Sequence, residues 1–332
     1  MASDRINRVR AVLRGESPDP PPFSCWYHFD EHAWRGEPAV AAHLRHIESL
    51  DLDFLKIMND NLYPRPTPGA VIETLDDLKA VKVLTPEAEA FSAQLDVIRR
   101  LTERLGGAML TTTTMFNGWS TLRYLCAPPS TVHRPPVLKR RADPRDERIT
   151  SFLREDRSAV AAAVDTISRS LAAFAKACVE AGADGVFLSV RDDWVDTDEN
   201  GLGTYAEIVR PADLRILEAS AAGEFNVLHV CGRPLDFDAF AQYPTHVIHW
   251  ADRCVPPSIA DVITTAQPAV CGGLDNLGTL VDGTPDQCAA QARDAVAQAG
   301  DRPILVAPGC TYDSAKVPLA NLRAARDAVR SG

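Results

Sequence analysis

One histidine and two cysteines in this 332-residue chain stand at the ends of apolar runs. His229 and Cys231 are separated by one residue, and Cys310 follows 79 positions later (310 − 231). Because side chains alternate along a strand, an H-x-C pair in a strand places its imidazole and thiol on the same side. Three protein ligands leave a tetrahedral zinc ion one open position, which is typical of a catalytic site. These residues therefore predict a catalytic zinc site with His229, Cys231 and Cys310 as ligands.

Each of these residues also has a structural interpretation. Cysteine is among the most buried residue types, and His229 alone could be a hydrogen-bonded core histidine. An H-x-C pair by itself is a weak signal, but Cys310 at the end of a second strand favours the metal. The other cysteines are expected to be packing residues: Cys25, Cys126, Cys178, Cys254, Cys271 and Cys288.

The elements that must position these ligands follow from eight short apolar runs, most of them followed by an amphipathic segment. The predicted strands cover residues 22–28, 54–58, 108–113, 185–190, 226–230, 246–250, 269–272 and 303–307. The predicted helices cover residues 39–50, 86–105, 157–181, 211–222, 235–242, 258–266, 284–299 and 318–330. Alternating strands and helices predict a parallel sheet, and eight strands predict an α/β fold of the (β/α)8 TIM-barrel class.

Three further features complete the predicted architecture. A helix over residues 5–13 precedes the first strand and is expected to cover the bottom of the barrel. Residues 127–147 are rich in Pro, Arg and Asp and predict a long loop or lid. We expect a single domain over residues 1–332, because α/β barrels often reach this length.

Polar residues follow the predicted strands at the end where β/α barrels carry their catalytic groups. A metal-bound histidine needs a hydrogen-bonded partner, so His249 and Asp193 are predicted to orient the ligands or a substrate. The candidate catalytic residues are thus His249, Asp193 and Asp275, and the candidate cofactor-binding residues are Asn276, Asp252 and Asp192. The fourth zinc ligand stays open among Glu31, Asp192, Asp252 and Asp275. For each aspartate, capping of the following helix is the structural alternative.

The composition excludes several classes of partner. The formal net charge of −10 argues against nucleic acid and anionic membranes. No apolar stretch reaches the roughly 18 to 20 residues that span a bilayer, and the N-terminal segment lacks the apolar core of a signal peptide. Eight cysteines without paired spacing indicate reduced thiols. We therefore expect a cytoplasmic protein.

The chain resembles the uroporphyrinogen decarboxylase superfamily over most of its length. Residues 8–16 followed by Pro18-Asp19 look like the family's N-terminal helix and its exit. Five further segments fall in the family's order, at residues 229–232, 273–276, 283–285, 308–310 and 318–329. True uroporphyrinogen decarboxylases carry an Arg-Gln-Ala-Gly-Arg segment after the first strand, whereas residues 25–32 here read CWYHFDEH. Without those arginines, binding of an eightfold carboxylated tetrapyrrole is not expected.

A second branch of the superfamily fits better. Its members are cobalamin-dependent methyltransferases with a His-x-Cys…Cys zinc site, which His229, Cys231 and Cys310 match residue by residue. This resemblance implies methyl transfer between a corrinoid (methylcobalamin) and a zinc-activated thiol such as coenzyme M, or another acceptor such as tetrahydrofolate. We expect the corrinoid on a separate corrinoid protein, although the sequence leaves open whether it binds directly. The expected partners are thus a small-molecule thiol or methylated substrate and a corrinoid protein. The sequence leaves open whether the protein is a monomer or a homodimer.

Two other functions remain as alternatives. A cofactor-free decarboxylase of a small aromatic or pyrrole-like acid would keep its activity after removal of zinc. A non-catalytic corrinoid- or metal-binding accessory protein would bind zinc or cobalamin without turnover.

Overall fold

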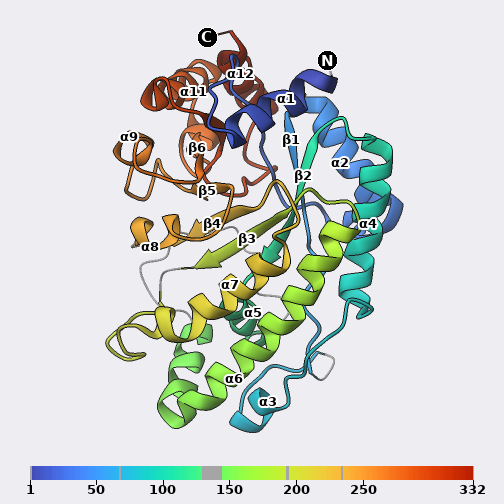
Figure 1. Ribbon diagram of the computed structural model, residues 1–332, viewed down its shortest axis with the longest axis vertical. Coiled ribbons are helices and arrows are strands. Elements are labelled where there is room, and N and C mark those ends of the chain that lie inside the picture. The colour runs from blue at the N-terminus through green and yellow to red at the C-terminus, as the bar shows by residue number, and fades with distance from the viewer. Residues whose placement is uncertain (1, 67–68, 129–143, 192–193, 233–234, 332) are drawn as a thin grey trace.

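The computed structural model describes residues 2–66, 69–128, 144–191, 194–232 and 235–331. In this part of the chain seven strands form one parallel sheet in which neighbours in the sheet are consecutive in the chain (Figure 1). They are β1 (Phe54–Ile57), β2 (Leu110–Phe116), β3 (Val186–Arg191), β4 (Val227–Cys231), β5 (Val247–Trp250), β6 (Ala269–Leu274) and β7 (Ile304–Pro308). These are the second to eighth predicted strands, so the predicted α/β fold with a parallel sheet is confirmed. The arrangement is consistent with a TIM-barrel-like fold.

The first predicted strand, residues 22–28, is wrong as a full strand. Phe23 forms a single parallel bridge with Val306 of β7, and the Phe23 carbonyl accepts from the Asp53 amide at 2.9 Å, next to β1. The short segment therefore lies between the two outermost strands. Three consecutive prolines, at positions 20 to 22, lack the N–H groups that a longer ladder would need.

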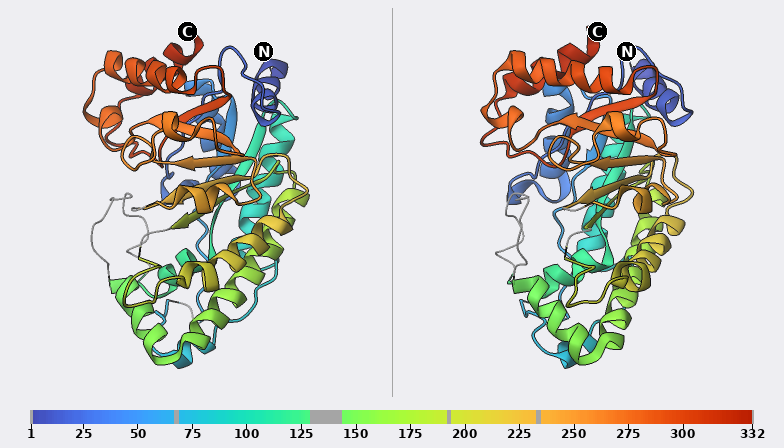
Figure 2. Two further views of the ribbon diagram at one scale, coloured as in Figure 1. Left: turned by 60° about the vertical axis from the view of Figure 1, so that its left-hand side comes forward. Right: turned by 90° about the vertical axis from the view of Figure 1, so that its left-hand side faces the viewer.

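Helices follow the strands as predicted, with ends shifted by a few residues. They are α2 (Gly36–Leu50), α4 (Glu89–Leu105), α6 (Pro144–Glu180), α7 (Arg210–Ala219), α8 (Phe237–Ala241), α9 (Ile259–Val262), α11 (Pro285–Ala299) and α12 (Leu319–Arg330). The short helices α3 (Leu75–Lys79), α5 (Gly118–Leu125) and α10 (Thr279–Asp282), the 3-10 turn Glu31–Ala33 and the π-helical turn Tyr205–Val209 were not predicted. Figure 2 shows α4, α6 and α7 on one side of the strands and α11 and α12 at the end where both termini lie.

The buried apolar residues form two cores. The larger one includes residues of the strands and of the helices around them, and in it Phe91 of α4 stacks on Phe174 of α6 with ring centres 4.4 Å apart. The smaller one includes Phe54, Leu110 and Phe225 together with Val9 and Val12 of α1 (Ala2–Leu13). Since Phe54 and Leu110 begin their strands, α1 covers the end of the sheet where the strands start, as predicted.

The predicted lid over residues 127–147 can be compared only at its ends. Residues 129–143 lie outside the described residues. Residues 144–147 are helical, because α6 begins at Pro144, and Asp146 in its first turn pairs with Arg123 of α5, whose Nη2 donates at 2.7 Å. The predicted start of this helix near residue 157 matches a break at Asp156, whose Oδ1 accepts from the Ala159 amide at 3.0 Å as a cap would.

No helix among the described residues has the length and apolar character required to cross a lipid bilayer.

Candidate metal centre

The three predicted ligands converge in space. His229 and Cys231 lie on β4, and Cys231 is its last residue; Cys310 comes two residues after β7. One ligand atom from each residue lies within 4.8 Å of the others. Strands β5 and β6 stand between β4 and β7 in the sheet, so only the curl of the sheet brings Cys310 to the other two. His229 is buried, and both cysteines are partly exposed.

The donor atoms suit a tetrahedral zinc ion. Zinc–nitrogen and zinc–sulfur bonds of about 2.0 to 2.3 Å at a tetrahedral angle place nitrogen and sulfur roughly 3.6 Å apart. The distance from Cys310 Sγ to His229 Nε2 is 3.6 Å. We name the group of His229, Cys231 and Cys310 the ligand cluster. Its donor set and spacing fit zinc with a fourth position left for another ligand.

A chain of hydrogen bonds fixes which nitrogen of His229 faces the cluster. His249 Nε2 lies 2.8 Å from the carbonyl oxygen of Pro308, which can only accept, so His249 donates there. Burial, together with the nearby His229, lowers the pKa of His249 well below its usual value, so its ring is neutral and Nδ1 is an acceptor. His229 Nδ1, 2.7 Å away, must then donate to it. With its proton on Nδ1, the neutral form of the His229 ring has its lone pair on Nε2, the nitrogen next to Cys310.

The two thiols have opposite acidities. A hydrogen bond from Cys231 and the positive charge of Lys56 lower the pKa of Cys310 to about 6, against the opposing effect of burial. The same hydrogen bond and burial raise the pKa of Cys231 to about 12, although the Arg191 guanidinium opposes this rise. Arg191 Nη1 also lies 3.8 Å from Cys231 Sγ. Without metal, the cluster therefore holds one thiolate, on Cys310, stabilised by the other thiol.

Sequence reasoning missed Lys56 and Arg191. Lys56 is the third residue of β1 and is buried. Burial lowers the pKa of its ammonium to about 8, while the nearby Cys310, Asp60 and Cys231 act in the opposite direction. A lysine inside the apolar run Phe-Leu-Lys-Ile-Met was a signal that could have found it. Charged residues are almost never fully buried unless they are paired.

Three other predicted site residues lie on the loops after β5 and β6. Asp252 accepts from the Gly273 amide at 2.8 Å, and burial raises the pKa of its carboxyl to about 6. Asp275 accepts from the backbone amides of Leu277 and Gly278, each at 3.0 Å, and so caps a turn. Asn276 is buried and donates to the carbonyl of Thr311, the residue after Cys310, at 3.0 Å. Asn276 thus ties the loop after β6 to the loop that carries Cys310.

The structure connects only some of the predicted residues to the ligand cluster. His249 contacts one member of the ligand cluster, His229. Asp192 and Asp193 lie outside the described residues. Glu31, a candidate fourth ligand, is exposed at the start of the 3-10 turn.

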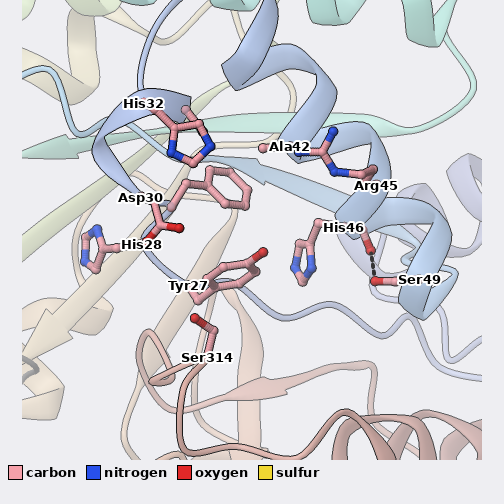
Figure 3. Close-up of a pocket in the computed structure, with 11 residues that line it drawn as sticks. Tyr27, His28, Asp30, His32, Ala42, Arg45, His46, Ser49 and Ser314 are labelled. Carbon is pink, nitrogen blue, oxygen red and sulfur yellow. Dashed lines mark hydrogen bonds between the residues drawn. The ribbon is translucent and has the colours of Figure 1, made fainter.

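A cavity of about 340 Å³ lies between the segment of residues 27–33, helix α2 and Ser314 (Figure 3). Its wall includes His28, Asp30, His32, Arg45 and Ser314. None of the three cluster ligands lines it. The polar loop after the first predicted strand therefore faces this separate cavity, although His28 also contacts the buried Asp60, with Nδ1 2.6 Å from Oδ1.

Comparisons with solved structures find similar folds at low sequence identity. A methyltransferase from Methanosarcina mazei superposes with a TM-score of 0.67 at 14% identity, over 98% of each chain. A B12-independent methionine synthase from Shewanella gives a TM-score of 0.44 at 12% identity, over 71% of this chain and 66% of that one. A putative vitamin-B12-independent methionine synthase from Listeria monocytogenes gives 0.47 at 14% identity, over 71% and 68%.

The similarity to the methyltransferase from Methanosarcina mazei supports the fold. Among curated proteins none matches the chain significantly. The family described as Uroporphyrinogen decarboxylase (URO-D) matches residues 56–332, a range that contains all seven strands except the first two residues of β1. This chain therefore belongs to the uroporphyrinogen decarboxylase family.

Proposed function

We propose that this protein is a zinc-dependent methyl- or alkyltransferase that moves a methyl group between a corrinoid and a thiol. The observation that carries the proposal is the convergence of one imidazole nitrogen and two sulfurs within 4.8 Å. Such a donor set suits zinc with an open position. Membership of a decarboxylase family does not by itself require decarboxylation, because one fold hosts many activities.

The residues of the chain would prepare the site for an acceptor thiol. His249 holds His229 with Nε2 toward the cluster, and Asn276 holds the loop that carries Cys310. Bound zinc would lower the pKa of a thiol in its open position, so that a thiolate is available near neutral pH. In the transfer the thiolate sulfur would take the methyl group of methylcobalamin, and the electron pair of the broken cobalt–carbon bond would stay with the corrinoid.

The remaining predictions belong to the same proposal. The segment around Phe23 would complete an eight-stranded β/α barrel, in one domain of a cytoplasmic protein. The corrinoid would be presented by a separate protein at the end of the sheet where the strands finish. Asp193 and Asp275 would orient the substrate or ligands, and Asn276, Asp252 and Asp192 would contact the cofactor.

Metal analysis of the purified protein tests the proposal first. We expect about one equivalent of zinc per chain, as a single structural or catalytic site requires, and its loss in Cys310→Ala. Cys288→Ala is the matched control, because Cys288 is a buried cysteine on α11, outside the cluster. A folded wild-type protein that takes up no zinc contradicts the proposal.

The second test is incubation of the zinc-loaded protein with methylcobalamin and a panel of thiols, following the absorption of the methyl–cobalt bond. Loss of this absorption with at least one thiol, and not with Cys310→Ala, supports methyl transfer. Release of carbon dioxide from aromatic acids by the metal-free protein would favour the decarboxylase alternative instead.

A further inference from the structure

Lys56 places a buried ammonium group in the interior of the sheet. Its Nζ lies 4.0 Å from the centre of the Phe187 ring and 5.2 Å from that of Trp26. Only 6% of the residue is exposed. Aromatic faces attract a cation without accepting its protons as strongly as an oxygen would. The two rings therefore hold the ammonium in place and leave its donors available.

In the part of the chain that the structure describes, Lys56 Nζ forms no hydrogen bond and no ion pair. The charge with the largest effect on it is that of Cys310, ahead of Asp60 and Cys231. The Asp60 carboxylate is already in contact with His28. Unused donors on the ammonium of a buried side chain need an explanation. The Phe187 ring that Lys56 contacts also lies 5.6 Å from the His229 ring, centre to centre, which brings the ammonium close to the ligand cluster.

We propose that Lys56 makes the ligand cluster selective for an anionic ligand, so that the acceptor is held there as an anion of the thiolate class. This inference rests on the proposed function. Lys56 is a charge-compensating residue in this view and takes no part in making or breaking the bonds of the transfer.

A charge count supports the assignment. A divalent ion with two cysteinates and a neutral imidazole has no net charge. A third thiolate leaves one negative charge, and burying an uncompensated charge is costly. The ammonium of Lys56 supplies the opposite charge from β1, whereas the cluster ligands come from β4 and the loop after β7. A neutral ligand gains nothing from it.

The test uses the full chain loaded with Co²⁺ in place of zinc, because cobalt(II) reports a fourth ligand through its visible spectrum. Thiocyanate serves as the anionic probe and imidazole as the neutral probe, both titrated at pH 7. We expect Lys56→Met to weaken thiocyanate binding by about tenfold or more, since opposite charges at a partly buried site attract far more strongly than in water. Imidazole binding should change less than about twofold, because it carries no charge.

Two variants separate charge from structure. Lys56→Arg keeps the charge and should retain most of the preference for thiocyanate. Lys176→Met removes an exposed lysine on α6, paired with Glu180 at 3.8 Å, and should change neither affinity. If Lys56→Met does not fold, Lys56→Gln provides the same comparison.

The outcomes distinguish this inference from the proposed function. Equal loss of both affinities, or no loss of either, overturns the role of Lys56 and leaves the metal site standing. A wild-type protein that takes up no cobalt overturns the proposed function, and the inference with it.

Discussion

The Nδ1 atoms of His229 and His249 lie 2.7 Å apart, and His249 in turn lies against the carbonyl of Pro308 at 2.8 Å. His229 is on β4 and Pro308 is the last residue of β7, two positions before Cys310. His249, on β5, therefore links the two parts of the chain that supply the ligands. The same link sets the tautomer of His229, so one side chain determines both the position and the chemistry of the ligand cluster.

Replacing His249 with phenylalanine should weaken zinc binding. The change removes the acceptor for His229 Nδ1–H and the link to Pro308, and loss of such an outer partner typically costs about 10- to 100-fold in metal affinity. Competition with a chelator of known affinity measures the effect. His46→Phe is the control, since His46 is also buried and contacts a backbone carbonyl, that of Cys25 at 2.8 Å. An unchanged affinity in folded His249→Phe contradicts the tautomer argument.

In metal-free protein, Cys310 should react with iodoacetamide before Cys231. Only a thiolate is strongly nucleophilic, and the pKa of Cys310 is lowered to about 6 while that of Cys231 is raised to about 12. The rate at Cys310 should thus rise as the pH passes about 6 and then level off, while Cys231 stays slow up to about pH 9. Mass spectrometry of labelled peptides measures both rates.

Added zinc should protect both cysteines from this reaction. Cys254, also partly exposed but outside the cluster, is the internal reference. Faster labelling of Cys231 than of Cys310 would show that the hydrogen bond between the two thiols runs in the other direction.

Most of the fold was predictable because the strands are apolar on both faces. The run at residues 226–230 predicted β4 to within one residue at each end, and the predicted helix over residues 284–299 matches α11 to within one residue. The first strand was not predictable by this criterion. Residues 22–28 are as apolar as a strand, but only Phe23 forms a bridge. The prolines before it prevent the ladder from extending toward the N-terminus, and apolar character alone does not show whether residues 24–28 pair with a neighbour.

The ligand cluster was predictable from side-chain chemistry, whereas its surroundings were not. Donor type and the position at strand ends were enough to choose His229, Cys231 and Cys310. Asp275 and Asp252 both accept from backbone amides, and the sequence cannot distinguish an aspartate that caps a turn from one that faces a ligand. The position of the Lys56 ammonium could not be predicted, because it depends on which way that side chain points across the sheet. This direction follows only from the register of β1 against its neighbours.

The contribution of Asp213 to protein stability should fall as the pH rises from about 4 to about 7. This buried carboxyl accepts from Asn117 at 2.9 Å, Tyr205 at 2.8 Å and Tyr243 at 3.2 Å. Burial outweighs these hydrogen bonds and raises its pKa from 3.8 to about 7. The folded protein thus holds this proton more tightly than the unfolded chain does. The contribution is full below the unfolded pKa and is lost as the pH passes the folded pKa.

Urea unfolding at several pH values measures this contribution. Asp213→Asn should remove this contribution, which falls by up to a few kcal/mol between about pH 4 and pH 8, from the pH dependence of the unfolding free energy. Asp301→Asn, at an exposed position in a turn, should leave it unchanged. Equal pH dependence in wild type and Asp213→Asn would show that the carboxyl stays ionised in the folded protein.

Gly309→Ala should disturb the ligand cluster more than it disturbs the fold. A Cβ at position 309 would lie 2.5 Å from the Cα of Ala251, in the loop after β5. Backbone cannot move away as a flexible side chain can, so the chain at 309 must shift and take the neighbouring Cys310 with it. Overpacking of this kind typically costs about 1 to 3 kcal/mol.

The control for this substitution is Gly300→Ala, which strains a residue with φ of 58° but meets no atom within 4 Å and lies in the turn after α11. Both variants should lower the free energy of unfolding, and only Gly309→Ala should also weaken zinc binding, because only there does the added methyl group press on the segment that carries a ligand. Thermal unfolding and chelator competition on the same preparations separate the two effects. If Gly309→Ala binds zinc as tightly as wild type does, the loop after β7 can adjust without moving the Cys310 sulfur.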